Sequence, residues 1–247
     1  METADFIKME AFKIFNKFSE LYFQFEVLGT QNLPDLAQQN HLFVMNHTAF
    51  FGLDGYLLAG VLSSRGINRP IRTMVWKHFL EGPMGKWFKA MGCIEANLDL
   101  AAEHMMDGEN VVIMPEGTDA TDVRNRINTF HTGYLRLLKK VPHISIVPIG
   151  FYGIDEAIPW WLTTNRYIVK KMMEPLNIGL DFYIFPKFPV PRPTKIVLAI
   201  GEPISFKPED LDTEEKIREC NARVKQAISN LVDACEHHRE QAISRSV

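Results

Sequence analysis

The chain has 247 residues, of which 46% are hydrophobic and 23% are charged, and its formal net charge at pH 7 is −3. This length allows one large domain or two small ones with a real hydrophobic core, and the composition is that of an ordinary globular protein. The small negative charge excludes a general electrostatic attraction to nucleic acid, so we expect no nucleic-acid partner.

Cysteine usage and hydropathy indicate the cellular compartment in which the protein is expected. The spacing of the three cysteines fits neither a disulfide pair nor a metal site, so we expect a reducing compartment and no bound metal. No run of about 18 apolar residues is present to span a bilayer. Charged residues interrupt the N-terminus where a secretory signal would be apolar, and we therefore expect a cytoplasmic protein.

Apolar residues recur at spacings of three and four through residues 4–25, with Lys8, Lys13 and Lys17 among the polar positions. This pattern predicts an amphipathic helix. Two interpretations stay open, and each can hold for a different part of the stretch. One is a helix packed on the domain core. The other is an interfacial helix whose Phe side chains enter a membrane while its Lys side chains stay near the headgroups.

Short apolar segments alternate with helical patterns from residue 41 to residue 150, after turn-like stretches at 27–29 and 32–34. The alternation predicts an α/β fold with a mixed, largely parallel sheet flanked by helices, preceded by the amphipathic N-terminal helix. The expected strands are 41–45, 71–76, 93–95, 111–114 and 144–150. The expected helices are 56–62, 98–107, 132–140 and, after Pro83, the rest of the stretch 79–91.

The pattern changes in the last third of the chain. Residues 155–193 are rich in aromatic residues and proline and look like an insertion, partly helical at 168–173. A strand at 195–200 and a charged amphipathic helix at 213–242 follow. The expected division is an N-terminal helical segment at 1–28, an α/β domain at 29–210 that includes the insertion, and a C-terminal helix at 211–247.

His47 and Asp54 follow the expected strand at 41–45. A histidine is the usual general base for a hydroxyl, and it works best when a carboxylate holds its other nitrogen. Seven residues of regular helix rise about 10.5 Å, too far for a hydrogen bond between these side chains. The pair therefore requires that residues 48–53 form a loop that folds back. Gly52 and the expected position of Asp54 as the cap of the next helix favour that loop.

A second polar loop, containing Glu116, follows the apolar strand at 111–114. Ligands of α/β sheets bind where strands end in loops, so we interpret the two loops as the walls of one site. Glu116 has two candidate roles, which are to accept hydrogen bonds from a substrate or to hold the loop. Gly117 lets the backbone approach a ligand closely.

Six short motifs occur in one order along the chain. They are Asn46-His47, Gly92-Cys93-Ile94, Met114-Pro115-Glu116-Gly117-Thr118, Phe130-His131-Thr132-Gly133, Val147-Pro148-Ile149 and Gly201-Glu202-Pro203-Ile204. Their order and spacing resemble the glycerolipid acyltransferases of the lysophosphatidate acyltransferase type, over residues 20–205. Six motifs in the right order are far more specific than any one of them.

Three departures from the family pattern stand out. The family aspartate position after His47 holds Gly52, which we interpret as a two-residue loop insertion ahead of Asp54. The two arginines that the family associates with the phosphate of the acceptor are also absent. Asn97 and Leu98 stand near the first position, and Asp119 stands at the second. Their absence disfavours lysophosphatidate unless nearby arginines, Arg124 and Arg126, replace them.

The resemblance implies an acyltransferase that moves a fatty acyl group from acyl-CoA or acyl carrier protein to a lipid hydroxyl, with a lysophospholipid as the expected acceptor and no cofactor. It implies His47 as general base and Asp54 as the residue that orients it. The substrate-binding residues that it implies are Asn46, Glu116, Gly117, Thr118, Arg124, Arg126 and His131. The expected location is peripheral, on the inner face of a membrane.

Two alternatives remain open. One is acylation of a neutral mono- or diacylglycerol, which fits the missing arginines better. The other is a non-catalytic lipid-binding module on the same fold, which the displaced aspartate alone supports. A hydrolase is disfavoured because the chain has no Gly-x-Ser-x-Gly motif.

Overall fold

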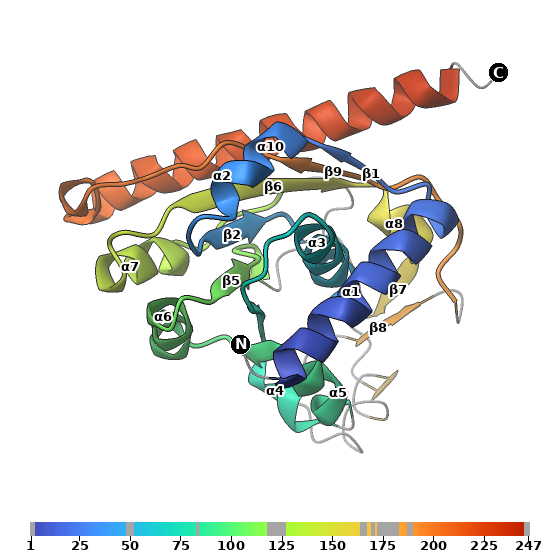
Figure 1. Ribbon diagram of the computed structural model, residues 1–247, viewed down its shortest axis with the longest axis horizontal. Coiled ribbons are helices and arrows are strands. Elements are labelled where there is room, and N and C mark those ends of the chain that lie inside the picture. Colours follow the sequence, from blue (N-terminus) through green and yellow to red (C-terminus); the bar gives the residue numbers. More distant parts are fainter. Residues whose placement is uncertain are drawn as a thin grey trace.

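The computed structural model describes residues 3–47, 52–82, 84–117, 127–163, 167–168, 171, 183–186 and 190–244. Its centre is a seven-stranded sheet with helices on both faces (Figure 1). Neighbouring strands are parallel throughout, except that β6 and β9 are antiparallel. The predicted mixed, largely parallel α/β sheet is therefore confirmed. In spatial order the strands are β1 (Glu26–Leu28), β9 (Val197–Ile200), β6 (Ile146–Tyr152), β2 (Leu42–Met45), β5 (Asn110–Ile113), β3 (Ile71–Val75) and β4 (Cys93–Glu95).

The alternation of side chains along each strand divides the core into two layers. On β2, Phe43 and Met45 face the layer formed with α1 (Thr3–Tyr22) and α3 (Leu53–Ser64). Leu42 and Val44 face the opposite layer. All four side chains are fully buried, which explains why this strand is apolar without interruption. The helices of the opposite layer are α6 (Leu98–Met106), α7 (Gly133–Lys140) and α10 (Glu214–Ser244).

The N-terminal helix α1 is packed on the core. It lies against α3, where a Cβ at Gly60 would come within 3.2 Å of the Phe12 carbonyl oxygen. Near its amino end, the carboxylate of Asp5 bonds the guanidinium of Arg72 on β3 at 3.3 Å. At its carboxyl end, the Tyr22 hydroxyl donates to the Pro191 carbonyl at 2.7 Å. In the described part of the chain, no helix is both long enough and apolar enough to cross a membrane.

The structure corrects two of the predicted elements near the N-terminus. The edge strand β1 overlaps the turn-like stretch at 27–29 and pairs with β9, and α1 ends before it, at Tyr22. The pairing partner is far along the chain, which local patterns do not reveal. Gly29 follows in the left-handed conformation (φ 74°), and the second turn-like stretch forms η1 (Thr30–Asn32) and α2 (Leu33–Leu36).

The helix expected after Pro83 in the stretch 79–91 is α5 (Gly85–Ala90), and a short helix that was not expected, α4 (Lys77–Glu81), precedes it. The predicted insertion contains α8 (Ile154–Ala157) and the antiparallel pair β7 (Trp160–Thr163) and β8 (Tyr183–Pro186). Most of the helix predicted at 168–173 lies outside the described residues. A short η5 (Pro208–Leu211) precedes α10. The division into three segments stays a prediction.

The contact between α10 and β6 depends on Gly150. A Cβ at this position would lie 2.7 Å from the Cβ of Leu231 and 2.9 Å from the backbone of α10. Overpacking of this kind lowers stability by about 1–3 kcal/mol. We therefore expect Gly150→Ala to lower the free energy of unfolding by that amount in urea titrations. Gly133→Ala is the control, because the nearest atom to its added Cβ is 3.9 Å away. Equal stabilities of the two variants would contradict this packing.

Candidate active site

The candidate site begins where β2 ends. His47 is the second residue after the strand, and Gly52 is the N-cap of α3, in the left-handed conformation (φ 71°). Asp54 is the second residue of α3, and its Oδ2 lies 2.8 Å from Nδ1 of His47. The chain therefore brings the two side chains together, as the folded-back loop requires. The expectation that Asp54 caps α3 is wrong, because Gly52 takes that position.

The carboxylate of Asp54 is held from both sides. Its side chain is fully buried, and its Oδ1 accepts the backbone N–H of Gly55 at 2.9 Å. A carboxylate beside Nδ1 fixes the proton of a neutral imidazole on that nitrogen, so Nε2 is left as the proton acceptor. The His47 side chain is 31% exposed. A buried carboxylate therefore holds a partly exposed imidazole.

Glu116 joins the two loops. Its side chain is fully buried, Oε1 accepts the backbone N–H of His47 at 3.2 Å, and Oε2 accepts the backbone N–H of Asn128 at 3.2 Å. Burial raises the pKa of Glu116, and these two hydrogen bonds oppose the rise. Of its two candidate roles, the described contacts are those of a carboxylate that holds the loops in place.

Asn46 fixes the end of β2 to β6. Its Nδ2 donates to the carbonyl of Phe151 at 3.0 Å, and its Oδ1 accepts the N–H of Phe151 at 2.8 Å. The Asn46 side chain is fully buried, and this reciprocal pair gives both its nitrogen and its oxygen a partner on the backbone of Phe151. Binding of substrate by Asn46 stays a prediction, and its described contacts connect β2 to β6.

Gly117 and His131 lie side by side at the second loop. Gly117 is left-handed (φ 57°), and a Cβ added there would lie 3.6 Å from Cδ2 of His131. The backbone N–H of His131 donates to the carbonyl of Pro115 at 2.9 Å. The structure thus brings His131 to the loop that carries Glu116. Three other predicted substrate-binding residues, Thr118, Arg124 and Arg126, lie outside the described residues.

The electrostatics of the site raise the proton affinity of His47. Burial alone lowers the pKa of this histidine, but the negative charges of Asp54, Glu116 and Asp155 outweigh that effect, and the pKa is raised above its ordinary value of 6.5. Asp155 lies on α8, after the carboxyl end of β6, and is itself buried. Three carboxylates therefore act on one imidazole.

Sequence reasoning missed two charged residues of this neighbourhood. Asp155 follows the strand at 144–150 and was assigned to the insertion, although the rule that sites gather at strand ends could have found it. Lys225 on α10 also acts on the site, since its positive charge lowers the pKa of Glu116. No local pattern distinguishes Lys225 from the other charged residues of its helix.

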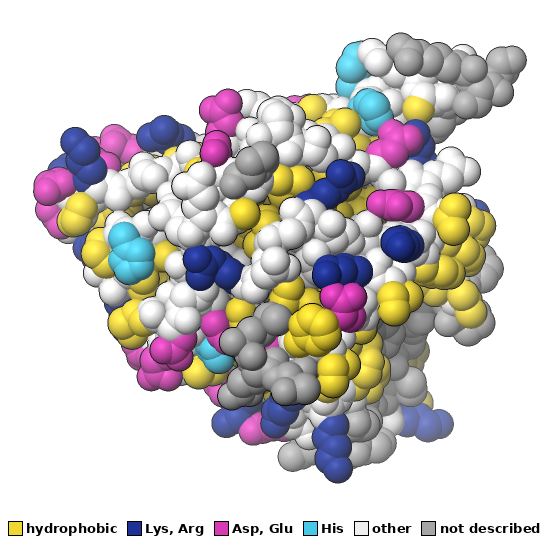
Figure 2. All heavy atoms as spheres, viewed as in Figure 1, with side chains coloured by type: hydrophobic (Ala, Val, Ile, Leu, Met, Phe, Trp, Pro, Cys, Tyr) yellow, Lys and Arg dark blue, Asp and Glu magenta, His cyan; other side chains and the backbone are white. Residues whose placement is uncertain are grey.

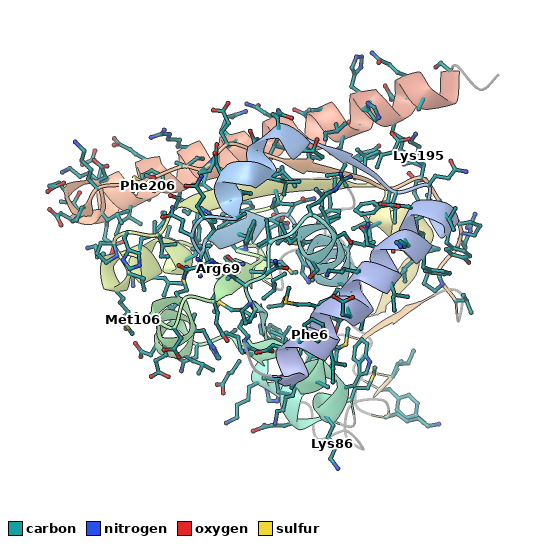
Figure 3. The ribbon with its side chains drawn as sticks, in the orientation of Figure 1. Phe6, Arg69, Lys86, Met106, Lys195 and Phe206 are labelled. Atoms are coloured by element: carbon teal, nitrogen blue, oxygen red, sulfur yellow. The ribbon has the colours of Figure 1, made fainter. Side chains whose placement is uncertain are left out.

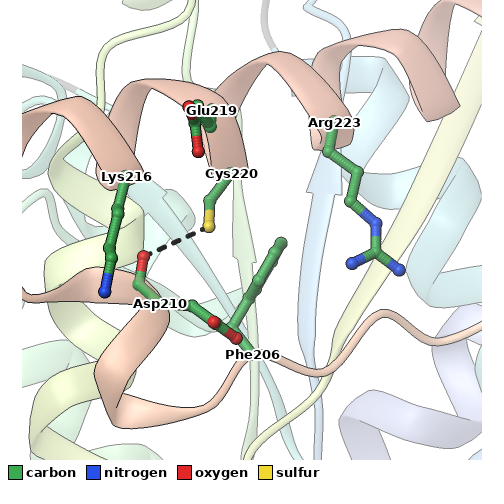
Figure 4. A pocket seen from close by; sticks show the side chains of 6 residues that line it. All are labelled: Phe206, Asp210, Lys216, Glu219, Cys220 and Arg223. Atoms are coloured by element: carbon green, nitrogen blue, oxygen red, sulfur yellow. Dashed lines mark hydrogen bonds between the residues drawn. The ribbon is translucent and has the colours of Figure 1, made fainter.

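A shallow pocket elsewhere on the surface is separate from these residues (Figure 4). It lies between η5 and the first half of α10 and contains none of the site residues described above. Its lining residues are Phe206, Asp210, Lys216, Glu219, Cys220 and Arg223.

Comparison with known proteins places this site in context. The family model described as Acyltransferase matches residues 24–152, which include His47, Asp54 and Glu116. No curated protein matches the sequence. The fold is similar to the crystal structure of the 1-acyl-sn-glycerophosphate (LPA) acyltransferase PlsC from Thermotoga maritima, with a TM-score of 0.58. The match covers 94% of this chain and 84% of that chain at 18% identity, a level at which the likeness shows the fold.

The charge arrangement predicts how His47 titrates. We expect an NMR titration of its imidazole to give a midpoint above 6.5, because the nearby carboxylates stabilise the protonated form. Asp54→Asn removes one of these charges and should move the midpoint to lower pH. The exposed Asp212→Asn is the control and should leave it unchanged. A midpoint at or below 6.5 in the unmodified protein would contradict this arrangement.

Proposed function

The chain belongs to the acyltransferase family, and on that premise we propose that it moves a fatty acyl group from an acyl thioester to the hydroxyl of a glycerolipid, with a lysophospholipid as acceptor. The donor is acyl-CoA or acyl carrier protein. The observation that carries this proposal is the 2.8 Å contact between His47 Nδ1 and Asp54 Oδ2 at the carboxyl end of a buried parallel strand.

The first step is attack of the acceptor on the thioester. Nε2 of His47 removes the proton of the hydroxyl while its oxygen bonds the carbonyl carbon of the donor. The imidazole becomes positively charged, and the buried carboxylate of Asp54 stabilises that charge and keeps the ring in position. The result is a tetrahedral intermediate with a negatively charged oxygen.

The second step is collapse of that intermediate. The carbon–sulfur bond breaks, the electron pair leaves with the sulfur, and His47 returns its proton to the thiolate. The products are an ester and a free thiol, and the histidine is neutral again. The thioester is already activated, so these steps use only protein side chains and the two substrates. General-base catalysis of this kind contributes about 10²–10⁴-fold to the rate.

A specific observation favours the neutral glyceride as a second candidate acceptor. Asn97 stands near a position where the resembled family has an arginine, and its side chain accepts the backbone N–H groups of Asp99 and Leu100 to cap α6. This residue offers no positive charge to a phosphate. The non-catalytic alternative is disfavoured, because a lipid-binding module has no need of a His47–Asp54 pair.

We also propose that the protein is peripheral on the cytoplasmic face of a membrane and that α1 contacts the lipid. On the side of α1 that faces the core, Met9 and Phe12 are buried, and Phe23, which follows the helix, is buried as well. On its outer side, hydrophobic and basic side chains lie together in the region where Figure 1 places α1 (Figure 2). The spacing of the exposed hydrophobic residues puts them on one side of the helix. These residues form the outer stripe: Ile7, Ile14, Phe18 and Leu21, which are 63%, 71%, 50% and 85% exposed.

Activity tests the catalytic assignment. Purified protein is incubated with mixed acyl-CoAs and a panel of lysophospholipids and neutral glycerides, and the products are identified by mass spectrometry. We expect an acylated lysophospholipid, formed at least about 100-fold more slowly by His47→Ala because the general base is lost. Circular dichroism verifies that the variant is folded. Activity within threefold of the unmodified protein would refute the role of His47.

Vesicle flotation tests the outer stripe. We expect the protein to float with vesicles of phosphatidylcholine and phosphatidylglycerol, and the double variant Ile14→Asn, Leu21→Asn to bind at least about tenfold more weakly, because each buried apolar side chain contributes about 1.5–3 kcal/mol.

The control is Met106→Asn, a change at a residue that is 62% exposed, and it is compared with the single variant Ile14→Asn, a change at a residue that is 71% exposed. Met106 lies on α6, apart from the helix that carries Phe6 (Figure 3). Protein that stays entirely at the bottom of the gradient, or equal flotation of Ile14→Asn and Met106→Asn, would remove the proposal.

A further inference from the structure

Lys225 is a partly buried cation on α10, one helical turn after Asn221. Over the residues that the structure describes, it forms no hydrogen bond and no ion pair, although its charge acts on Glu116. An ammonium that is partly shielded from water attracts a nearby anion more strongly than a fully hydrated one. A position of this kind therefore suits an anionic ligand.

The placement of Lys225 follows from the residue one helical turn before it. Asn221 donates from Nδ2 to the carbonyl of Phe130 at 3.1 Å, and its Oδ1 accepts the hydroxyl of Tyr134 at 2.8 Å. Residues four apart lie on the same face of a helix. The face of α10 that carries Lys225 is thus fixed against the segment that leads into His131.

The same segment reaches the catalytic loop. The backbone N–H of His131 donates to the carbonyl of Pro115, next to Glu116. Glu116 in turn accepts the N–H of His47. An unbroken series of contacts therefore connects the face of α10 that carries Lys225 to the general base, and it is independent of the electrostatic effect on Glu116.

The charge balance of the site makes a cation necessary for a phosphate-bearing substrate. Asp54, Glu116 and Asp155 are all carboxylates that act on His47. Asn97, near one of the positions where the resembled family has an arginine, is a neutral helix cap. A phosphate that approaches His47 would be repelled unless a positive group faces it.

We propose that Lys225 binds the phosphate of a substrate beside the catalytic loop. This inference rests on the proposed acyl transfer. The phosphate has two possible sources, the headgroup of a lysophosphatidate-like acceptor or the phosphates of acyl-CoA. The C-terminal helix, which lies beyond the residues that the family model matches, then determines which substrates the site accepts.

The test measures KM for substrates that differ only in phosphate. The acceptors are a short-chain lysophosphatidate and the matching monoacylglycerol, and the donors are acyl-CoA and the phosphate-free S-acyl-N-acetylcysteamine. The variants are Lys225→Met, Lys225→Gln and Lys225→Arg. Arg218→Met is the control, because it removes a positive charge from an exposed position of the same helix.

With the phosphate-free donor, we expect Lys225→Met to raise KM for the lysophosphatidate at least about tenfold, because a hydrogen bond to a charged group is lost. KM for the monoacylglycerol should stay unchanged, because this acceptor carries no phosphate. A rise in KM for acyl-CoA with the monoacylglycerol acceptor would instead identify the donor as the source. Lys225→Gln should behave like Lys225→Met, Lys225→Arg should retain much of the affinity, and Arg218→Met should change nothing. Unchanged KM values for both phosphate-bearing substrates overturn the proposal.

Calorimetric binding separates this proposal from the proposed function. It measures Kd for lysophosphatidate and for CoA without turnover. If no acyl product forms but Lys225→Met weakens binding of either ligand about tenfold or more, the phosphate site stands and the acyl-transfer proposal fails. Equal Kd values for the unmodified protein and the folded Lys225→Met and Lys225→Gln variants overturn the phosphate site, whatever the activity.

Discussion

The hydrogen bond between His47 and Asp54 is the interaction on which the candidate site depends. It joins a histidine that has just left a buried strand to a carboxylate already inside the next helix. A buried carboxylate is strongly destabilising unless donors surround it, so Asp54 requires both the imidazole and the N–H of Gly55. The left-handed backbone of Gly52, which glycine adopts without strain, starts the helix at the point where this geometry is possible.

The surrounding residues keep His47 in place from two directions. Asn46 ties the end of β2 to β6, and Glu116 ties the backbone of His47 to the loop after β5. Both side chains are fully buried and satisfied by backbone groups. Parallel strands make this possible, because their carboxyl ends meet at one edge of the sheet. The sheet therefore presents one histidine, restrained by its neighbours, to solvent.

Much of this arrangement could be predicted from the sequence. The alternation of apolar segments and helical patterns indicated the sheet, and the polar residues after the strands at 41–45 and 111–114 indicated the two loops. β1 was missed because three residues pair with a strand about 170 positions away, which no local pattern encodes. Lys225 was missed for the same reason, since its importance depends on how α10 packs. The cap of α3 was misassigned because the backbone conformation of Gly52 decided it.

The spacing of seven residues between His47 and Asp54, two more than in the resembled family, raises the question of whether the two side chains act as one unit. A double-mutant cycle answers it, with kcat/KM measured for the unmodified protein, Asp54→Ala, His47→Ala and the double variant. If Asp54 acts through His47, its removal lowers kcat/KM by about 100-fold or more in the unmodified protein and has no further effect once His47 is gone. The same factor in both backgrounds would show that the two residues act independently, and it would contradict a catalytic unit formed by His47 and Asp54.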